Sequence, residues 1–301
     1  MNPTPGLGGS SDWAEVMKQS SFGPGALLLR RQARHDLAVF YAYCRAIDDC
    51  ADEFEAPEAR KHLLRWKDVL GGKPAPLAAP LPPALMEVCR RREIPLALLQ
   101  DLWQGAWADA HPPVRFKTFA QVQGYAYRVA GAVGLACLPI FGVGIKEGRE
   151  FAVNLGEAFQ LINIIRDVAE DAAHGRLYVG LDDLRDHGLD AATFMAGEGG
   201  VRAERLFNTY AWRARQAFAR AEAGAVGLPR GPLRTPLLMR ALYEHLLEVM
   251  SADRFQVFKK RYKLRSARKR HIVATALLGL PAGFPMPARL MWQYQKAPVH
   301  A

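Results

Sequence analysis

Two pairs of aspartates are spaced so that they could bind divalent cations. Asp48 and Asp52 lie in the segment FYAYCRAIDDCADE, and Asp167 and Asp171 lie far along the chain in GEAFQLINIIRDVAED. Residues four apart share one face of an α-helix, so each pair would present two carboxylates side by side. Like charges held that close repel each other unless a cation neutralises them. The two pairs therefore predict a cation site.

Polar residues extend each pair along the same helical face. Tyr41 and Arg45 precede the first pair, and Gln160 and Asn163 precede the second, at steps of three and four residues. If the chain had only one such pair of aspartates, a solvent-exposed helical face with ordinary ion pairs would explain it equally well. Two such stripes, each set in an apolar segment, favour a buried site, because a carboxylate buried without a partner costs several kcal/mol.

Oxygen ligands on helical scaffolds suit Mg²⁺, with Mn²⁺ as the alternative ion. Mg²⁺ is held by one or two carboxylates, keeps water ligands and completes its octahedron with phosphate oxygens. We therefore expect Asp48, Asp52, Asp167 and Asp171 to hold Mg²⁺ together with a diphosphate group.

The segments that position these residues have helical periodicity almost throughout. No alternation typical of strands is evident, so the expected fold class is all-α, in a single domain. Helices are expected at 27–51, 59–70, 83–92, 95–110, 116–132, 146–173, 202–223 and 236–260, and loops at 71–83, 174–186 and 224–232. The uncharged stretch 130–145 is too short and too rich in Gly and Pro to span a membrane, and we expect a broken buried helix there.

The formal net charge of +10 predicts an anionic partner. No nucleic-acid-binding module is evident, so nucleic acid is disfavoured. Eight of the twelve residues in 259–270 are basic, and an uncharged segment follows at 272–288. This combination predicts peripheral contact with an anionic membrane, although a basic helix end followed by a core-packing tail would have the same sequence. Cysteines at no metal-ligand spacing and an N-terminus without a secretory signal predict a cytoplasmic protein, peripheral on the inner face of the membrane.

Three stretches resemble the signatures of the squalene and phytoene synthases. SSFGPGALLLRRQARHDLAVFYAYCRAIDDCADE is similar to the first signature, YAYRVAGAVG to the central one, and GEAFQLINIIRDVAEDAAHGRLYV to the second. The likeness runs in the same order from Ser20 to about Arg270. It implies an all-α isoprenoid-synthase bundle around a central cavity and Mg²⁺-dependent head-to-head joining of two prenyl diphosphates. The domains implied are a flexible N-terminus (1–19), a catalytic domain (20–270) and an apolar tail (271–301) that contacts membrane.

The resemblance also implies roles for single residues. Asn163 would be a further metal ligand or would position water, and Gln160 would line the cavity. Diphosphate contacts are implied for Ser21, Arg45, Arg176 and Tyr178. Phe22, Tyr41 and Tyr127 match positions that face the cavity, where aromatic rings can stabilise a carbocation; for Phe22 and Tyr127 a plain core role is an equal alternative.

The product is less constrained than the family. The motif RDVAEDAAHGRLY most resembles members of the bacterial hopanoid pathway that convert farnesyl diphosphate to presqualene diphosphate. Squalene, dehydrosqualene and phytoene are alternative products, and the first would require NADPH. No Rossmann fingerprint is present, so NADPH use is left open. A terpene cyclase acting on one prenyl diphosphate and a non-catalytic relative that serves in assembly are alternatives from other classes.

Overall fold

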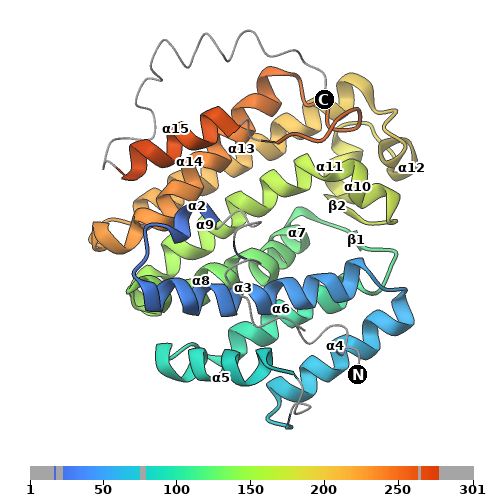
Figure 1. The fold of residues 1–301 in the computed structure, drawn as a ribbon. Coiled ribbons are helices and arrows are strands. Elements are labelled where there is room, and N and C mark those ends of the chain that lie inside the picture. Colours follow the sequence, from blue (N-terminus) through green and yellow to red (C-terminus); the bar gives the residue numbers. More distant parts are fainter. Residues whose placement is uncertain (1–16, 18–22, 75–78, 264–265, 278–301) are drawn as a thin grey trace.

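The computed structural model describes residue 17 and residues 23–74, 79–263 and 266–277. They form a helical bundle (Figure 1), which confirms the predicted all-α class. The longer helices are α3 (Arg31–Asp52), α4 (Ala56–Leu70), α5 (Leu81–Arg92), α6 (Leu96–Asp109), α8 (Ala132–Phe141), α9 (Ile145–Arg166), α13 (Gly200–Gly224), α14 (Arg230–Ala252) and α15 (Ser266–Leu277). Shorter ones are α2 (Gly23–Ala26), α7 (Phe119–Ala126), the π-helix η1 (Tyr127–Gly131), α10 (Val168–Ala173), α11 (Leu181–Asp186) and α12 (Ala191–Met195).

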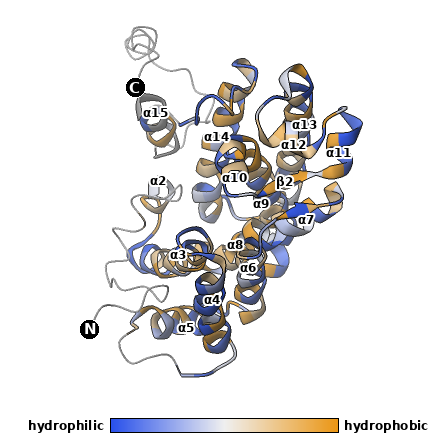
Figure 2. Ribbon diagram, turned by 90° about the vertical axis from the view of Figure 1, so that its right-hand side faces the viewer, coloured by the Kyte–Doolittle hydropathy of each residue, from blue (hydrophilic) through white to orange (hydrophobic). Residues whose placement is uncertain are grey.

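Helix α9 is the centre of the bundle. Helices α13, α8 and η1 pack along it, and α3 and α6 pack against α8 from the other side. In Figure 2, α8 is largely hydrophobic and α11 on the periphery is hydrophilic, as expected for a core helix and a surface helix. This arrangement brings α3, which carries the first acidic pair, towards the end of α9, where the second pair lies.

A glycine permits the close approach of α9 to η1. A Cβ atom at Gly156 would lie 2.7 Å from the backbone of Ala130 and Gly131. Because real Cβ atoms do not approach backbone that closely, a side chain at this position would push α9 away from η1. The absence of a side chain at Gly156 therefore sets the position of the second acidic segment.

The predicted loop at 174–186 is wrong. Its first half contains β2 (Leu177–Gly180), which pairs in parallel with β1 (Arg115–Phe116), and its second half is α11. A strand of two residues is too short to produce an alternating pattern, which explains why none was seen. The last long helix also differs from the prediction, because α14 begins at Arg230, passes through Pro236 and ends at Ala252.

One helical stretch among the described residues, Phe119–Phe141, is long and apolar enough to cross a membrane. It comprises α7, η1 and α8, and half of its most apolar window is buried inside the protein. The other helices of the bundle, α6 and α9 above all, supply that burial. Its composition is therefore explained by packing in the bundle core.

Candidate active site

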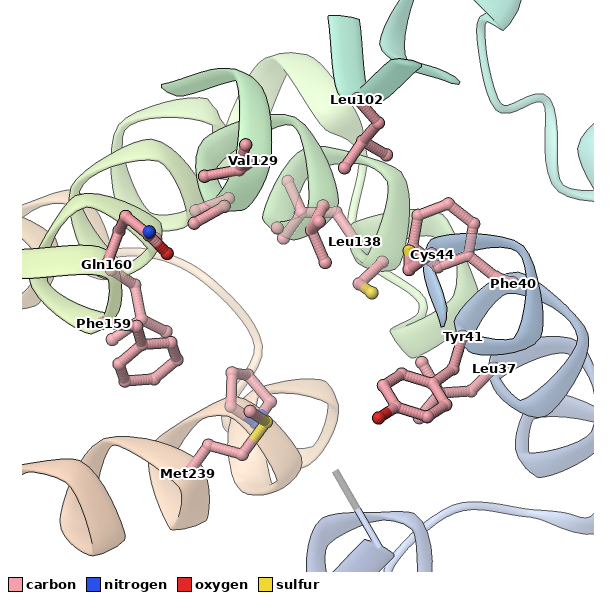
Figure 3. A pocket seen from close by; sticks show the side chains of 18 of the residues that line it. Leu37, Phe40, Tyr41, Cys44, Leu102, Val129, Leu138, Phe159, Gln160 and Met239 are labelled. Atoms are coloured by element: carbon pink, nitrogen blue, oxygen red, sulfur yellow. The ribbon is translucent and has the colours of Figure 1, made fainter. Parts of the chain in front are cut away.

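An apolar chamber lies between α3, α8, α9 and α14 (Figure 3). Leu37 and Tyr41 of α3 face Met239 of α14 across it, and Phe159 and Gln160 of α9 close another side. Most of its lining is aliphatic or aromatic. Such a chamber can hold a hydrocarbon chain and exclude water from it.

An acidic pocket adjoins the chamber. Asp48, Gln160 and Asn163 line both spaces, so the two meet at these residues. The pocket is also lined by Asp52, Asp109, Tyr125, Asp167, Asp171, Arg176 and Tyr178. The four aspartates of the two sequence pairs, which come from α3 and from the α9–α10 junction, therefore surround one space.

Arginines neutralise two of the four aspartates. The Arg176 guanidinium donates to Asp52 Oδ1 at 2.6 Å. Arg166 donates through Nε to Asp167 Oδ1 at 2.8 Å, and Arg261 lies 3.2 Å from the same oxygen. The contacts of Arg176 and Arg261 join segments that are far apart in sequence, and they leave these guanidinium groups beside the pocket.

Among the described residues, no arginine or lysine forms an ion pair with Asp48 or Asp171. Burial, together with repulsion from neighbouring aspartates, raises the pKa of each carboxyl to about 8; the neighbours are Asp52 and Asp109 for Asp48, and Asp167 for Asp171. Asp48 is exposed to the space of the pocket, but the protein atoms that surround this pocket limit the hydration of its carboxyl. A cation in the pocket would favour the ionised form of both groups.

The donors present fit Mg²⁺. Asn163 Oδ1 is buried and has no hydrogen-bond partner among the residues that the structure describes. An amide oxygen left in this state beside carboxylates is suited to bind a metal ion or its water. No three His, Cys, Asp or Glu side chains in the described part of the chain gather around a single point. Each ion would therefore take one or two carboxylates and draw its other ligands from water and substrate, as Mg²⁺ commonly does.

Metal-free protein is expected to lose stability as the pH rises through about 8. The carboxyls of Asp48 and Asp171 have a pKa near 8 in the folded chain, against an ordinary value of 3.8. Their contribution to stability is complete below the unfolded pKa and is lost as the pH passes the folded pKa. Thermal melts should show the Tm falling over this window, and Mg²⁺ should raise the Tm most at its alkaline end. A metal-free Tm that increases with pH there would contradict this assignment.

Two residues of the pocket, Asp109 and Tyr125, were missed from the sequence. The Tyr125 hydroxyl donates to Asp109 Oδ2 at 2.8 Å, and the Tyr178 hydroxyl donates to Oδ1 at 2.7 Å. The two tyrosine rings stack with centroids 4.9 Å apart. Burial raises the pKa of Asp109 to about 6. Tyr125 and Tyr127 both lie in the motif YAYRVAG, and Tyr127 is the one that was predicted to face the cavity.

Asp109→Asn is expected to lower activity about 10- to 100-fold, the usual cost of losing a group that orients site residues. The amide keeps the shape but removes the charge that both tyrosine hydroxyls face. Steady-state rates over a pH series should show the loss together with a changed pH profile, because the carboxyl of Asp109, whose pKa burial raises to about 6, no longer titrates. Asp101→Asn, two turns earlier on α6, is the matched control; equal effects in both variants would exclude a role for Asp109.

The remaining predicted residues occupy several environments. Tyr41 lines the chamber, where burial raises its pKa to about 12. Arg45 is half-exposed and pairs with Asp49 at 2.6 Å. Tyr127 lines neither the chamber nor the acidic pocket and packs over Gly131. Ser21 and Phe22 lie outside the described residues.

Comparisons with known proteins point to one family. Residues 17–268 match the squalene/phytoene synthase family. The chain is 33% identical over 254 residues to a presqualene diphosphate synthase of Zymomonas mobilis, covering 82% of this chain and 85% of that protein. It is 30% identical to a 15-cis-phytoene synthase of Synechocystis, covering 83% and 78% respectively. It is also 30% identical to phytoene synthase 1 of Zea mays, of which it spans 64% while the match covers 88% of this chain.

Solved structures show the same fold. A dehydrosqualene synthase in complex with a ligand superimposes with a TM-score of 0.77 at 24% identity, covering 89% of this chain and 94% of that one. A squalene synthase from Alicyclobacillus acidocaldarius gives a TM-score of 0.70 at 22% identity, with coverages of 83% and 98%. At these identities the likeness extends to the helical architecture alone.

Proposed function

Because the chain belongs to the squalene/phytoene synthase family, we propose that it joins two molecules of farnesyl diphosphate head to head and forms presqualene diphosphate. Head-to-head condensation of prenyl groups is the reaction of this family, and the chain is a prenyltransferase of that type. Three parts of this statement are proposals: the substrate, farnesyl diphosphate; the product, presqualene diphosphate; and the metal, Mg²⁺.

The observation that carries the proposal is the position of the acidic pocket at the end of the apolar chamber. A prenyl diphosphate has a charged head and an apolar tail, and these two spaces match them. Along α3, Asp48 and Leu37 are roughly 16 Å apart, which is about the length of an extended farnesyl chain. The tail would lie between α3 and α14 while the head reaches the aspartates.

Diphosphate leaves only when its charge is neutralised as the allylic bond breaks. Mg²⁺, when bound, supplies Lewis-acid stabilisation of that charge. Asp48, Asp52, Asp167 and Asp171 would hold it, with the free Oδ1 of Asn163 as a further ligand.

Arginines beside the pocket would hold the leaving group. If Asp52 and Asp167 held the metal, Arg176 could turn away from Asp52, which it contacts at 2.6 Å, and Arg261 from Asp167 at 3.2 Å, although Arg261 also pairs with Glu170 at 2.8 Å. Their guanidinium groups can then donate to diphosphate oxygens, for which the geometry of arginine is well suited.

The chamber would protect the carbocation that remains. Its walls exclude water, which would otherwise capture the cation. The ring of Tyr41 lies on the chamber side of α3 and can face positive charge. Condensation with the second prenyl group can then compete with hydrolysis.

A phytoene synthase is the second candidate, because several relatives of similar identity carry that name. Dehydrosqualene and, with NADPH, squalene are further alternative products that the same assay would detect. A non-catalytic assembly protein is disfavoured because it would have no need of four aspartates around one pocket. For location we propose the cytoplasm, with peripheral contact to the membrane that takes up the product.

Purified protein should be incubated with farnesyl or geranylgeranyl diphosphate and Mg²⁺, with and without NADPH, and the extracted lipid analysed by mass spectrometry. A C30 diphosphate formed from farnesyl diphosphate without NADPH is the expected result. A C40 hydrocarbon from geranylgeranyl diphosphate would transfer the assignment to phytoene. A cyclised product of a single prenyl group would refute the head-to-head reaction.

A further inference from the structure

The turn between α2 and α3 exposes one of three consecutive leucines. Leu29 packs against the main core, and Leu28 packs in a second apolar cluster with Leu238 and Leu242 of α14 and Ile272 of α15. Leu27 is 57% exposed. Since its two neighbours find apolar partners, the turn holds this one leucine in solvent.

Arg34 fixes the shape of this turn. Its Nε donates to the carbonyl of Ala26 at 3.0 Å, and its Nη2 donates to the carbonyl of Leu29 at 3.1 Å. The exposed position of Leu27 is therefore a defined feature of the surface. A single exposed leucine is common, and it gains meaning only from its surroundings.

The surroundings are cationic. Arg30, Arg31, Arg34 and, on α15, Arg270 are exposed. Neither the segment 23–35 nor α15 contains an acidic residue. We call Leu27 and these four arginines the turn–α15 face.

The two parts of the turn–α15 face are held together, and nearby acid is neutralised. Contact of Leu28 with the cluster that contains Ile272 places the turn beside α15, and both views show α2 and α15 on the same side (Figures 1 and 2). The next acid along α3, Asp36, is fully buried and accepts from Arg91 at 2.5 Å and Arg92 at 2.7 Å. The face therefore combines positive charge with an exposed apolar side chain.

The face adjoins the apolar end of the chamber. The hydroxyl of Thr235 on α14 donates to the carbonyl of Gly25 on α2 at 3.0 Å. The next residue of α14, Pro236, lines the chamber, as does Leu37 near the start of α3. The acidic pocket lies at the opposite end of that stretch of α3. A hydrocarbon tail in the chamber would thus point towards this face.

We infer that the turn–α15 face docks on an anionic lipid bilayer. Arginines near such a surface are attracted to its phospholipid headgroups, and Leu27 can insert between them. The reason for docking rests on the proposed function: a prenyl product would pass from the apolar end of the chamber into lipid with little exposure to water. The docking itself depends only on the charge and shape of the face.

A different face offers a matched comparison. On α13, Trp212 is 59% exposed and lies between the exposed Arg205 and Arg215. Its composition also suits a membrane surface, but no residue of α13 lines the chamber or the acidic pocket. Binding through α13 would give the product no route into lipid.

Flotation with vesicles of phosphatidylcholine, with and without phosphatidylglycerol, tests the inference in the absence of substrate. We expect the full chain to float only with the anionic vesicles and to be released by salt. Arg30→Ser with Arg31→Ser should weaken partitioning about fivefold for each arginine removed, and Leu27→Ser should weaken it further. Arg205→Ser with Arg215→Ser should leave it unchanged.

Four results would overturn the inference. They are equal flotation with neutral vesicles, no flotation with either kind of vesicle, loss of flotation confined to the α13 variant, and a Leu27→Ser change that leaves flotation unaltered but dissociates a dimer of the chain. Because the assay contains no prenyl diphosphate, it is independent of the product assay. Protein that floats but does not condense farnesyl diphosphate would refute the proposed function and keep the docking face.

Discussion

Asp48→Asn and Asp171→Asn should each lower the turnover of prenyl diphosphate by at least about 10³-fold. Asparagine keeps the size of the side chain but removes the charge that would hold a cation in the acidic pocket. Neither aspartate has a basic partner among the described residues, and both have a pKa raised to about 8. Ionising these two carboxyls reduces the stability of the fold, and metal binding would explain why the protein has them at these positions.

The same variants should be at least as stable as the wild type when metal is absent. The ionised carboxyl opposes folding in this pocket, so its removal relieves repulsion. Melting temperatures with and without Mg²⁺ should be measured beside the rates, and the stabilisation by Mg²⁺ should shrink in both variants. Asp68→Asn is the control and should alter neither quantity, because Asp68 is an exposed residue of α4 that pairs with Lys73. Near-normal turnover in both pocket variants would refute the metal site.

Gly156→Val should destabilise the protein by about 1–3 kcal/mol or more, as expected for overpacking a well-filled core. Even a Cβ atom at this position would lie 2.7 Å from the backbone of Ala130 and Gly131, which cannot rotate away as a side chain could. Movement of α9 away from η1 would also separate the two acidic segments. Activity should consequently fall in the fraction of the protein that remains folded.

Urea denaturation followed by circular dichroism measures the loss of stability, and the product assay measures the loss of activity. Gly124→Ala on α7 is the matched control, because its Cβ would have no neighbour within 4 Å. That change should be neutral or should stabilise the helix by up to about 1 kcal/mol. An equal response of the two glycines would show that the contact of α9 with η1 is not tight.

The convergence of the two acidic segments could be predicted because periodicity and chemistry agreed. In α3, apolar residues at helical spacing showed which side of the segment is buried, and Asp48 fell on the same face as Tyr41. The same reasoning applied to Asn163 and Asp167 at the end of α9. The structure places all four of these residues around the chamber and the acidic pocket.

Single residues brought in by the tertiary fold could not be predicted in this way. Asp109 ends α6 without another acid three or four residues away, and Arg261 belongs to a basic run in which nothing distinguishes it from its neighbours. Tyr125 and Tyr127 lie in one motif, and only the packing of η1 shows which of them reaches the pocket. The pairing of β1 with β2 is equally non-local, since β1 has only two residues and the four residues of β2 are all buried, so neither strand alternates.

The bond from Arg176 to Asp52 joins positions 124 residues apart. A nascent polypeptide leaving the ribosome carries the first acidic pair long before the second has been synthesised. Contacts of such long range form late, after the intervening chain has closed. A chain cut short before the second acidic segment consequently contains only one wall of the acidic pocket.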